Sequence, residues 1–383
     1  MMPQSLDMIT RLVGFDTVSR HSNLDLIHFV RDYLAAQGVA SQLVESPAGD
    51  KANLFATVGP QVEGGIVLSG HTDVVPVDGQ PWETDPFTVT EKSGRLYGRG
   101  TCDMKAFIAV GLAMVPRMLQ AGLRRPVHFA LSYDEEVGCT GAPPMIARLA
   151  REIARPAAVI VGEPSSMKPI MAHKGLAPVR TTVIGHEAHS SQIQRGVSAV
   201  MTAARLITFL DDLMAENKAH ADPDCPFVPP YTTLHVGVVH GGTAVNIISR
   251  ECSFTWDCRA LPGDSVQRYL DKFRAYCDSL LPAMRAIAPE SSITTELLAD
   301  APPLTSDGDD TAQRLAMRLT GSSACGVVPY ATEGGQFQAR GFSVVVCGPG
   351  SIDQAHQPNE YIEIAQVEAC EAFMENVIAH CAS

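Results

Sequence analysis

Several apolar runs along the chain lead directly into a histidine or an acidic residue. Four of them lie at residues 64–70 before His71, 126–133 before Glu135 and Glu136, 157–162 before Glu163, and 341–350 before the loop that carries His356. These runs are continuous rather than alternating, which is typical of strands covered on both faces of a sheet. In open α/β sheets, reacting groups gather beyond the carboxyl ends of the strands. The pattern therefore predicts parallel strands that bring these side chains to one edge of a sheet.

Helical spacing occurs between these runs. Leu24, Ile27, Val30 and Leu34 recur at helical intervals, so we interpret residues 7–38 as one helix that ends at Gly38. Two further helices are expected at residues 105–120 and between the turn at 138–144 and Pro156. Helices alternating with buried strands indicate an α/β fold.

The segment from 178 to 300 has a different character. Its strands and helices follow the order β-α-β-β-α-β, which is the pattern of a ferredoxin-like α+β sandwich. The expected strands lie at 179–185, 232–242, 251–261 and 292–298, and the expected helices lie at 198–214 and after Pro262. We therefore predict a large α/β domain with a mixed, mostly parallel sheet, formed by residues 1–177 and 301–383 and interrupted by the smaller domain at 178–300.

Composition limits the classes of partner. A chain of 383 residues is long enough for two cores, and its 45% hydrophobic and 19% charged residues are ordinary for a globular protein. A formal charge of −13 disfavours nucleic acid and anionic membrane as partners. The first residues lack the features of a secretory signal, no apolar stretch is long enough to cross a membrane, and ten cysteines occur without a CxxC pair. We expect reduced thiols and a cytoplasmic protein.

Five of the side chains at the predicted sheet edge form a metal-ligand set. His71, Asp103, Glu136, Glu163 and His356 supply two imidazoles and three carboxylates, donors that divalent cations such as zinc accept. If Asp103 bridges two ions, each ion receives the bridge, one histidine and one further carboxylate. Two simpler interpretations stay open, because Asp103 can cap the helix behind it and Glu163 can be an ordinary turn acid.

Longer motifs around these residues carry a resemblance to a known family. SGHTDVVPVDGQPW, GRGTCDMK, DEEVGCTG, GEPS and GPGSIDQAHQPNEY are similar to the di-zinc amidohydrolases that include acetylornithine deacetylase and succinyl-diaminopimelate desuccinylase, most of all the acetylornithine deacetylase branch. The resemblance implies one metal held by His71, Asp103 and Glu163, and a second held by Asp103, Glu136 and His356. It implies Glu135 as the general base that takes a proton from water and passes it to the departing amine.

The resemblance also assigns roles around the metals. Asp73 is expected to accept a hydrogen bond from the non-ligating nitrogen of His71, although a turn cap is the alternative. His189 is expected to reach the active site of a partner subunit and to donate a hydrogen bond to the oxyanion of the intermediate. This role implies a homodimer. The small domain would then serve as a lid and dimerisation domain. Without the resemblance, His189 is a surface histidine.

Four residues are candidate substrate contacts. Asn246 and Arg259 can meet the oxyanion or a substrate carboxylate, although Arg259 can also form a structural ion pair. Gly334 allows close backbone approach, and Glu333 is a candidate contact for a substrate ammonium. Two positions depart from the family pattern, Ala106 in place of a common glycine and Asn359 in place of a common acid.

The resulting hypothesis is metal-dependent hydrolysis of the amide bond of an N-acyl amino acid. The first expected substrate is N2-acetylornithine, cleaved to ornithine and acetate in arginine biosynthesis, with two Zn²⁺ ions or alternatively Co²⁺ or Mn²⁺. Desuccinylation, deacylation of another N-acyl amino acid and dipeptide hydrolysis remain alternatives, because pocket contacts alone distinguish them. A non-catalytic binding or scaffold relative is the alternative of another class.

Overall fold

The structure is a computed structural model that describes residues 1–306 and 308–383. The chain forms two compact units. The large unit comprises residues 1–172, 304–327 and 332–383, and the small unit comprises residues 173–303 and 328–331. The borders expected at 177 and 301 fall inside the small unit, because the two connecting segments pair there. Leu176 and Ala301 exchange backbone hydrogen bonds of 2.8 and 2.9 Å.

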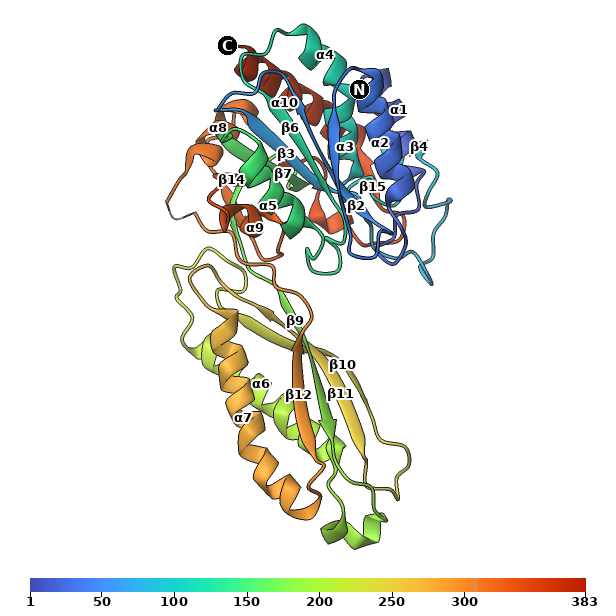
Figure 1. Cartoon of the computed structure of the whole chain (residues 1–383), viewed down its shortest axis with the longest axis vertical. Coiled ribbons are helices and arrows are strands. Elements are labelled where there is room, and N and C mark those ends of the chain that lie inside the picture. Colours follow the sequence, from blue (N-terminus) through green and yellow to red (C-terminus); the bar gives the residue numbers. More distant parts are fainter. Residues whose placement is uncertain (307) are drawn as a thin grey trace. The chain divides into compact units, whose positions relative to one another are not determined.

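An eight-stranded mixed sheet forms the centre of the large unit (Figure 1). Its strand order is β1-β2-β6-β3-β7-β14-β8-β13, and the four central strands, β6, β3, β7 and β14, pair in parallel. The predicted mixed α/β sheet is confirmed. The strands formed by the continuous apolar runs pair in parallel, while the β1–β2, β2–β6 and β14–β8 pairs are antiparallel. The strands are β1 (Ser41–Glu45), β2 (Ala52–Val58), β3 (Ile66–His71), β6 (Val127–Ser132), β7 (Ala158–Pro164), β8 (Ile170–His173), β13 (Gly326–Val328) and β14 (Val344–Gly348).

Helices lie on both faces of this sheet (Figure 1). They are α1 (Pro3–Val13), α2 (Leu24–Ala36), α3 (Lys105–Ala113), α4 (Val115–Gln120), α5 (Ala142–Glu152), α8 (Thr311–Thr320), α9 (Gly334–Gln338) and α10 (Ile364–Ala382). A separate antiparallel sheet has the order β15-β5-β4, with bounds β4 (Thr90–Lys92), β5 (Arg95–Tyr97) and β15 (Tyr361–Glu363). A short 3₁₀ helix, η2 (Ile352–Gln354), lies in the loop before His356.

The N-terminal prediction of one helix over residues 7–38 is wrong. The apolar positions from Leu24 to Leu34 belong to α2 alone, whereas α1 ends at Val13. Between the two helices the chain is extended enough for Val18 to bridge Val74. This bridge is a tertiary contact, so local spacing could not indicate it.

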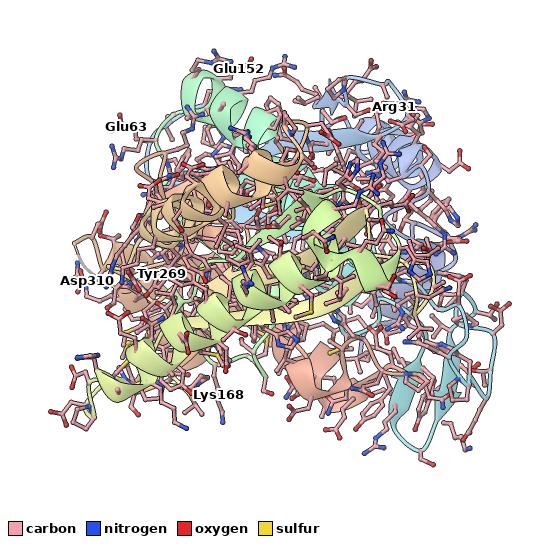
Figure 2. All side chains as sticks on the ribbon, turned by 90° about the horizontal axis from the view of Figure 1, so that it is seen from below. Arg31, Glu63, Glu152, Lys168, Tyr269 and Asp310 are labelled. Atoms are coloured by element: carbon pink, nitrogen blue, oxygen red, sulfur yellow. The ribbon has the colours of Figure 1, made fainter. Side chains whose placement is uncertain are left out.

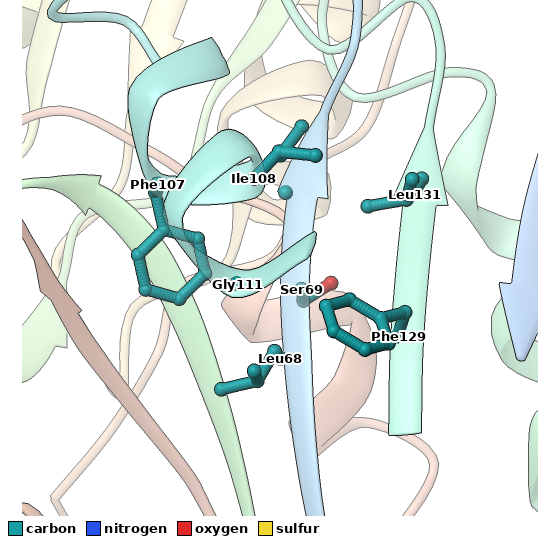
Figure 3. Close-up of a pocket in the computed structure, with 8 residues that line it drawn as sticks. Leu68, Ser69, Phe107, Ile108, Gly111, Phe129 and Leu131 are labelled. Atoms are coloured by element: carbon teal, nitrogen blue, oxygen red, sulfur yellow. The ribbon is translucent and has the colours of Figure 1, made fainter. Parts of the chain in front are cut away.

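Helix α3 is buried on all sides, and its packing positions the metal-ligand loop that precedes it. Figure 3 shows Phe107, Ile108 and Gly111 of α3 packed over the strands next to Leu68 of β3 and Phe129 and Leu131 of β6. The hollow that these side chains line leaves no space for a water molecule. At Gly111, an added Cβ would lie 3.0 Å from the Phe129 ring, so the glycine allows this close approach.

The small unit contains a four-stranded antiparallel sheet of order β10-β11-β9-β12. With two helices, this gives the β-α-β-β-α-β order and confirms the predicted ferredoxin-like fold. Trp256 and Phe254 of β11 pack on Phe273 of α7 in its core. Its elements are β9 (Ala177–Ile184), η1 (Ser190–Arg195), α6 (Ala199–Ala219), β10 (Thr233–Gly241), β11 (Glu251–Arg259), α7 (Val266–Ile287) and β12 (Ser292–Leu297).

Many charged side chains lie at the surface of the protein, although a few, such as Arg99 and Glu360, are buried. In Figure 2, the labelled Arg31, Glu63, Glu152, Lys168 and Asp310 project from the periphery of the ribbon. Among the described residues, no helix is long and apolar enough to span a membrane. Each of the ten cysteines is a free thiol.

Candidate metal centre

The five predicted ligands converge at the carboxyl edge of the four parallel strands. His71 is the last residue of β3, and Glu163 lies near the end of β7. Glu136 follows β6 by four residues, and His356 lies in the loop after β14 and η2. Asp103 lies in the turn just before α3. Sequence positions spread over almost 300 residues therefore meet at one place in the large unit.

Asp103 lies between the two histidines. Its Oδ1 is 2.9 Å from Nε2 of His71, and its Oδ2 is 3.4 Å from Nε2 of His356. Each histidine has one further carboxylate beside the same nitrogen, Glu163 at 3.4 Å from His71 and Glu136 at 3.0 Å from His356. This arrangement has the connectivity expected of two ligand sets that share Asp103.

The donor set fits divalent cations. Two donors about 2.1 Å from one tetrahedral ion are about 3.4 Å apart, close to the separations between the imidazole and carboxylate atoms. Oε1 of Glu136 and Oε1 of Glu163 are buried and have no hydrogen-bond partner among the described residues. Burial and the Asp103 carboxylate raise the pKa of Glu163 well above its usual range and that of Glu136 to about 7. Bound cations would neutralise this excess of buried negative charge.

Two groups of donor atoms lie close together in combinations that differ from the two expected ligand sets. Donor atoms lie within 4.8 Å of one another in two triads, one of His71, Glu135 and Glu163 and one of His71, Asp103 and Glu136. His71 therefore lies at the centre of the cluster. His356 approaches from the rim, with a side chain that is 52% exposed against 1% for His71.

Glu135 and its neighbour Glu136 point to different parts of the centre. Glu135 lies with His71 and Glu163, whereas Glu136 contacts His356. The thiol of Cys139 donates to Oε1 of Glu135 at 3.1 Å. Burial, with a smaller contribution from the Glu136 carboxylate, raises the pKa of Glu135 to about 8. A carboxylate with a pKa near neutrality suits proton transfer.

Asp73 orients His71 differently from the prediction. Its backbone carbonyl oxygen is 2.9 Å from Nδ1 of His71, whereas its carboxylate Oδ1 is 3.6 Å away. A carbonyl oxygen only accepts, so Nδ1 carries the proton and Nε2 is left to face a metal. The carboxylate instead accepts the backbone N–H groups of Glu135 and Glu136, each at 3.2 Å, and the Ser19 hydroxyl at 2.7 Å. Asp73 thus orients His71 through its backbone oxygen and holds the loop of Glu135 and Glu136 through its carboxylate.

Glu333 does not lie where a substrate ammonium could reach it, which corrects the predicted contact. Only 1% of its surface is exposed, and its two carboxylate oxygens accept hydrogen bonds from the hydroxyls of Ser69 in β3 and Ser132 in β6. Glu333 therefore joins the strands that carry His71 and Glu135. Gly334 is also buried, at the start of α9, where its N–H donates to Thr332.

Sequence reasoning missed Glu360, a buried carboxylate beneath the Asp103 loop. Glu360 accepts backbone hydrogen bonds from Gly100, Cys102 and Asp103 and pairs with Arg99 at 2.7 Å. The available signal was an acid four residues after His356 and directly before the short strand β15. Asn359, which departs from the family pattern, adopts a positive φ of 57°, and its side-chain oxygen accepts the N–H of Glu83 at 2.7 Å.

The remaining predicted residues belong to the small unit. His189 is exposed, and its Nδ1 accepts the backbone N–H of Ser191 at 3.2 Å. Since a backbone N–H can only donate, the proton of a neutral His189 ring lies on Nε2, which leaves that nitrogen as a donor. The backbone oxygen of Asn246 accepts the N–H of Ser190, next to His189. Arg259 pairs through Nε with Asp257 at 3.1 Å, as in the ion-pair alternative.

Comparison with known proteins identifies the family. Residues 67–380 match Peptidase family M20/M25/M40. The chain belongs to this family. The M20 chain is 34% identical over 391 residues to the acetylornithine deacetylase of Myxococcus xanthus, and the match covers 99% of this chain and 98% of that protein. The predicted resemblance is confirmed at the level of the family, and the chain is an enzyme of the metallopeptidase and amidohydrolase class.

Solved structures share the M20 fold. A metallo-carboxypeptidase of Sulfolobus solfataricus aligns with a TM-score of 0.77 at 18% identity, covering 98% of this chain and 99% of that one. A Bacillus subtilis protein described as a dinuclear metal-binding M20 peptidase aligns with a TM-score of 0.63 at 14% identity, covering 98% and 97%. At these identities the likeness concerns the fold.

Proposed function

We propose that the chain hydrolyses the amide bond of an N-acyl amino acid, with N2-acetylornithine as the first candidate, and releases ornithine and acetate. The observation that carries this proposal is the shared position of Asp103 between His71 and His356, each with its own second carboxylate. The name of the Myxococcus xanthus relative supports the choice of substrate, since that match extends over nearly the full length of both chains.

Two divalent ions, zinc first among them, would be held by His71, Asp103 and Glu163 and by Asp103, Glu136 and His356. When bound, such ions polarise a carbonyl and lower the pKa of water. Glu135 accepts the proton of the attacking water and returns it to the amine nitrogen as the C–N bond breaks. The new C–O bond leaves in acetate, so one water is consumed for each amide cleaved.

We also propose that the enzyme is a homodimer in which His189 of one protomer donates from Nε2 to the oxyanion formed in its partner. Exposed apolar side chains of the small unit support such an interface. They come from η1, from the start of α6, from the edge strand β10 and from the loop after it, and comprise Ile193, Val200, Met201, Val238, Val239, Val245 and Ile247. Large exposed apolar side chains on neighbouring elements are typical of an interaction surface. Asn246 and Arg259 would contact the substrate, and the free thiols agree with a cytoplasmic location.

A substrate panel tests the proposal. The purified enzyme, loaded with Zn²⁺ or Co²⁺, is assayed with N2-acetylornithine, N-acetylcitrulline, N-succinyl-diaminopimelate and dipeptides. The largest kcat/KM is expected for N2-acetylornithine. A larger value for a succinyl substrate or a dipeptide would change the assignment within the family. Absence of turnover on the whole panel, with metal demonstrably bound, would favour a non-catalytic scaffold.

A further inference from the structure

We infer that Gln80, Arg99 and Glu360 form a positioning network that sets the affinity of the second metal position, the one formed by Asp103, Glu136 and His356. The first position, formed by His71, Asp103 and Glu163, depends on it much less. The inference rests on the proposed two-metal function. None of the three network residues is among the proposed ligands, the base or the substrate contacts.

Glu360 connects the loop of Asp103 to the loop of His356. Its Oε1 accepts the backbone N–H of Cys102 at 2.8 Å and of Asp103 at 3.1 Å, and its Oε2 accepts from Nη1 of Arg99 at 2.7 Å. Glu360 follows His356 by four residues, so the same carboxylate anchors the segment that carries this histidine. It is almost completely buried, where charge-assisted hydrogen bonds are strong and specific in direction.

Gln80 closes the network on His356 itself. Nη2 of Arg99 donates to Oε1 of Gln80 at 2.6 Å, and Nε2 of Gln80 donates to the backbone oxygen of His356 at 3.0 Å. The indole N–H of Trp82 donates to the same Oε1 at 3.0 Å. These partners fix the orientation of the amide, because Arg99 and Trp82 can only donate and a carbonyl oxygen can only accept.

The two metal positions differ in how their histidines are held. His71 ends a central strand, is almost fully buried, and has Nδ1 next to the Asp73 carbonyl. His356 lies in a loop at a positive φ of 62° with half of its side chain exposed, so packing restrains it little. The Gln80 contact holds its backbone, and Glu360 holds the segment after it. Loss of the network should therefore move His356 and leave His71 in place.

Arginine is the residue that this geometry requires. Arg99 directs one terminal nitrogen to Glu360 and the other to Gln80, and a lysine ammonium cannot provide this planar fork. The arrangement has a cost, since the buried Nε of Arg99 has no hydrogen-bond partner among the described residues. An unpaired buried donor is destabilising, so packing stability alone does not explain an arginine at this site.

Two substitutions of the half-buried Gln80 separate positioning from packing. Q80L removes all hydrogen bonds of the side chain at similar volume. Q80E keeps oxygens for Arg99 and Trp82 but has no donor for the His356 carbonyl. The matched control is Q267L on α7 of the small unit, where the exposed Gln267 donates to Asp271. Thermal unfolding of each metal-free variant checks the fold.

The measurement is a stepwise titration of the metal-free protein with Zn²⁺, in competition with a chromophoric chelator. We expect the first equivalent to bind as in the wild type and the second to bind about 10- to 100-fold more weakly in both Q80L and Q80E, with Q267L unchanged. Equal weakening of both steps, unchanged steps in both variants, or wild-type behaviour of Q80E would overturn the inference. Fewer than two equivalents in the wild type would instead refute the proposed two-metal function, and the inference with it.

Discussion

His128, near the start of β6, provides a quantitative test of how burial shapes the titration of this protein. Its side chain is buried, Nδ1 lies 2.9 Å from the Thr57 hydroxyl, and Nε2 has no hydrogen-bond partner among the described residues. Burial lowers the pKa of His128 from 6.5 to about 4. The ring is therefore neutral in the native protein at every pH at which the enzyme is expected to work.

The sign of the effect follows from proton linkage. Above pH 6.5 the ring is neutral in both folded and unfolded chains and contributes no pH dependence. As the pH falls toward 4, the unfolded chain binds a proton that the native protein excludes, so stability is lost. At pH 5 this loss amounts to about 2 kcal/mol, and it approaches about 3 kcal/mol below pH 4.

The assay compares urea unfolding of the wild type and His128→Gln at about pH 8 and about pH 5, with metal-free protein. A W256F background leaves Trp82, in the large unit, as the only tryptophan, so fluorescence follows the unit that contains His128. We expect the free-energy difference between the two proteins to change by about 2 kcal/mol in favour of the variant at the lower pH. A difference that is the same at both pH values would refute the reasoning, because other titrating groups cancel between the two proteins.

Four further outcomes are expected. Glu135→Ala should abolish turnover while two equivalents of metal still bind by elemental analysis; residual turnover would exclude it as the base. Asp73→Asn, which puts an amide N–H near backbone donors, should reduce kcat by about 10- to 100-fold at unchanged metal content, and a change in KM alone would contradict its role. Mixing the inactive Glu135→Ala and His189→Ala homodimers should restore about a quarter of wild-type activity if His189 acts in the partner, and none if it acts in its own chain. Gly162→Ala should lower the free energy of unfolding by about 1–3 kcal/mol in chemical denaturation, because its Cβ would lie 2.1 Å from the Phe107 ring.

The central sheet and the ligand cluster could be predicted because one physical pattern determines both. A strand covered on both faces is continuously apolar, so the runs ending at His71 and Glu163 indicated parallel strands with functional side chains at their carboxyl ends. The order of elements in the small unit was predictable for a similar reason. The strands β9 to β12 and the helices α6 and α7 differ in the spacing of their apolar residues, so each could be recognised in turn.

The residues that support the centre could not be predicted from local pattern. Glu333 is buried because Ser69 and Ser132 reach it from two different strands, and Glu360 because three backbone donors of a loop 260 residues earlier face it. Asp73 shows a finer limit, since H-x-D spacing indicated contact with His71 but not that the contact is made by the backbone oxygen. The hydrogen-bond partners of these residues are distant in the sequence, so the spacing of apolar residues cannot predict them.

The strands and loops that carry the ligand residues explain why the two proposed metal positions should differ in character. Strands β3 and β7 pair in parallel with Ser69 opposite Val161, and His71 and Glu163 each follow this pair by two residues, with 3.4 Å between Nε2 of His71 and Oε1 of Glu163. Two of the three residues of the first position therefore lie on paired strands, which resist displacement because neighbouring strands move together, while Asp103 comes from the turn before α3. Glu136 and His356 come from loops, so the geometry of the second position depends on the contacts of Gln80 and Glu360 and of the Asp73 carboxylate. In the proposed two-metal centre, the strand residues would hold one cation firmly and the loop residues would let the other adjust as substrate binds.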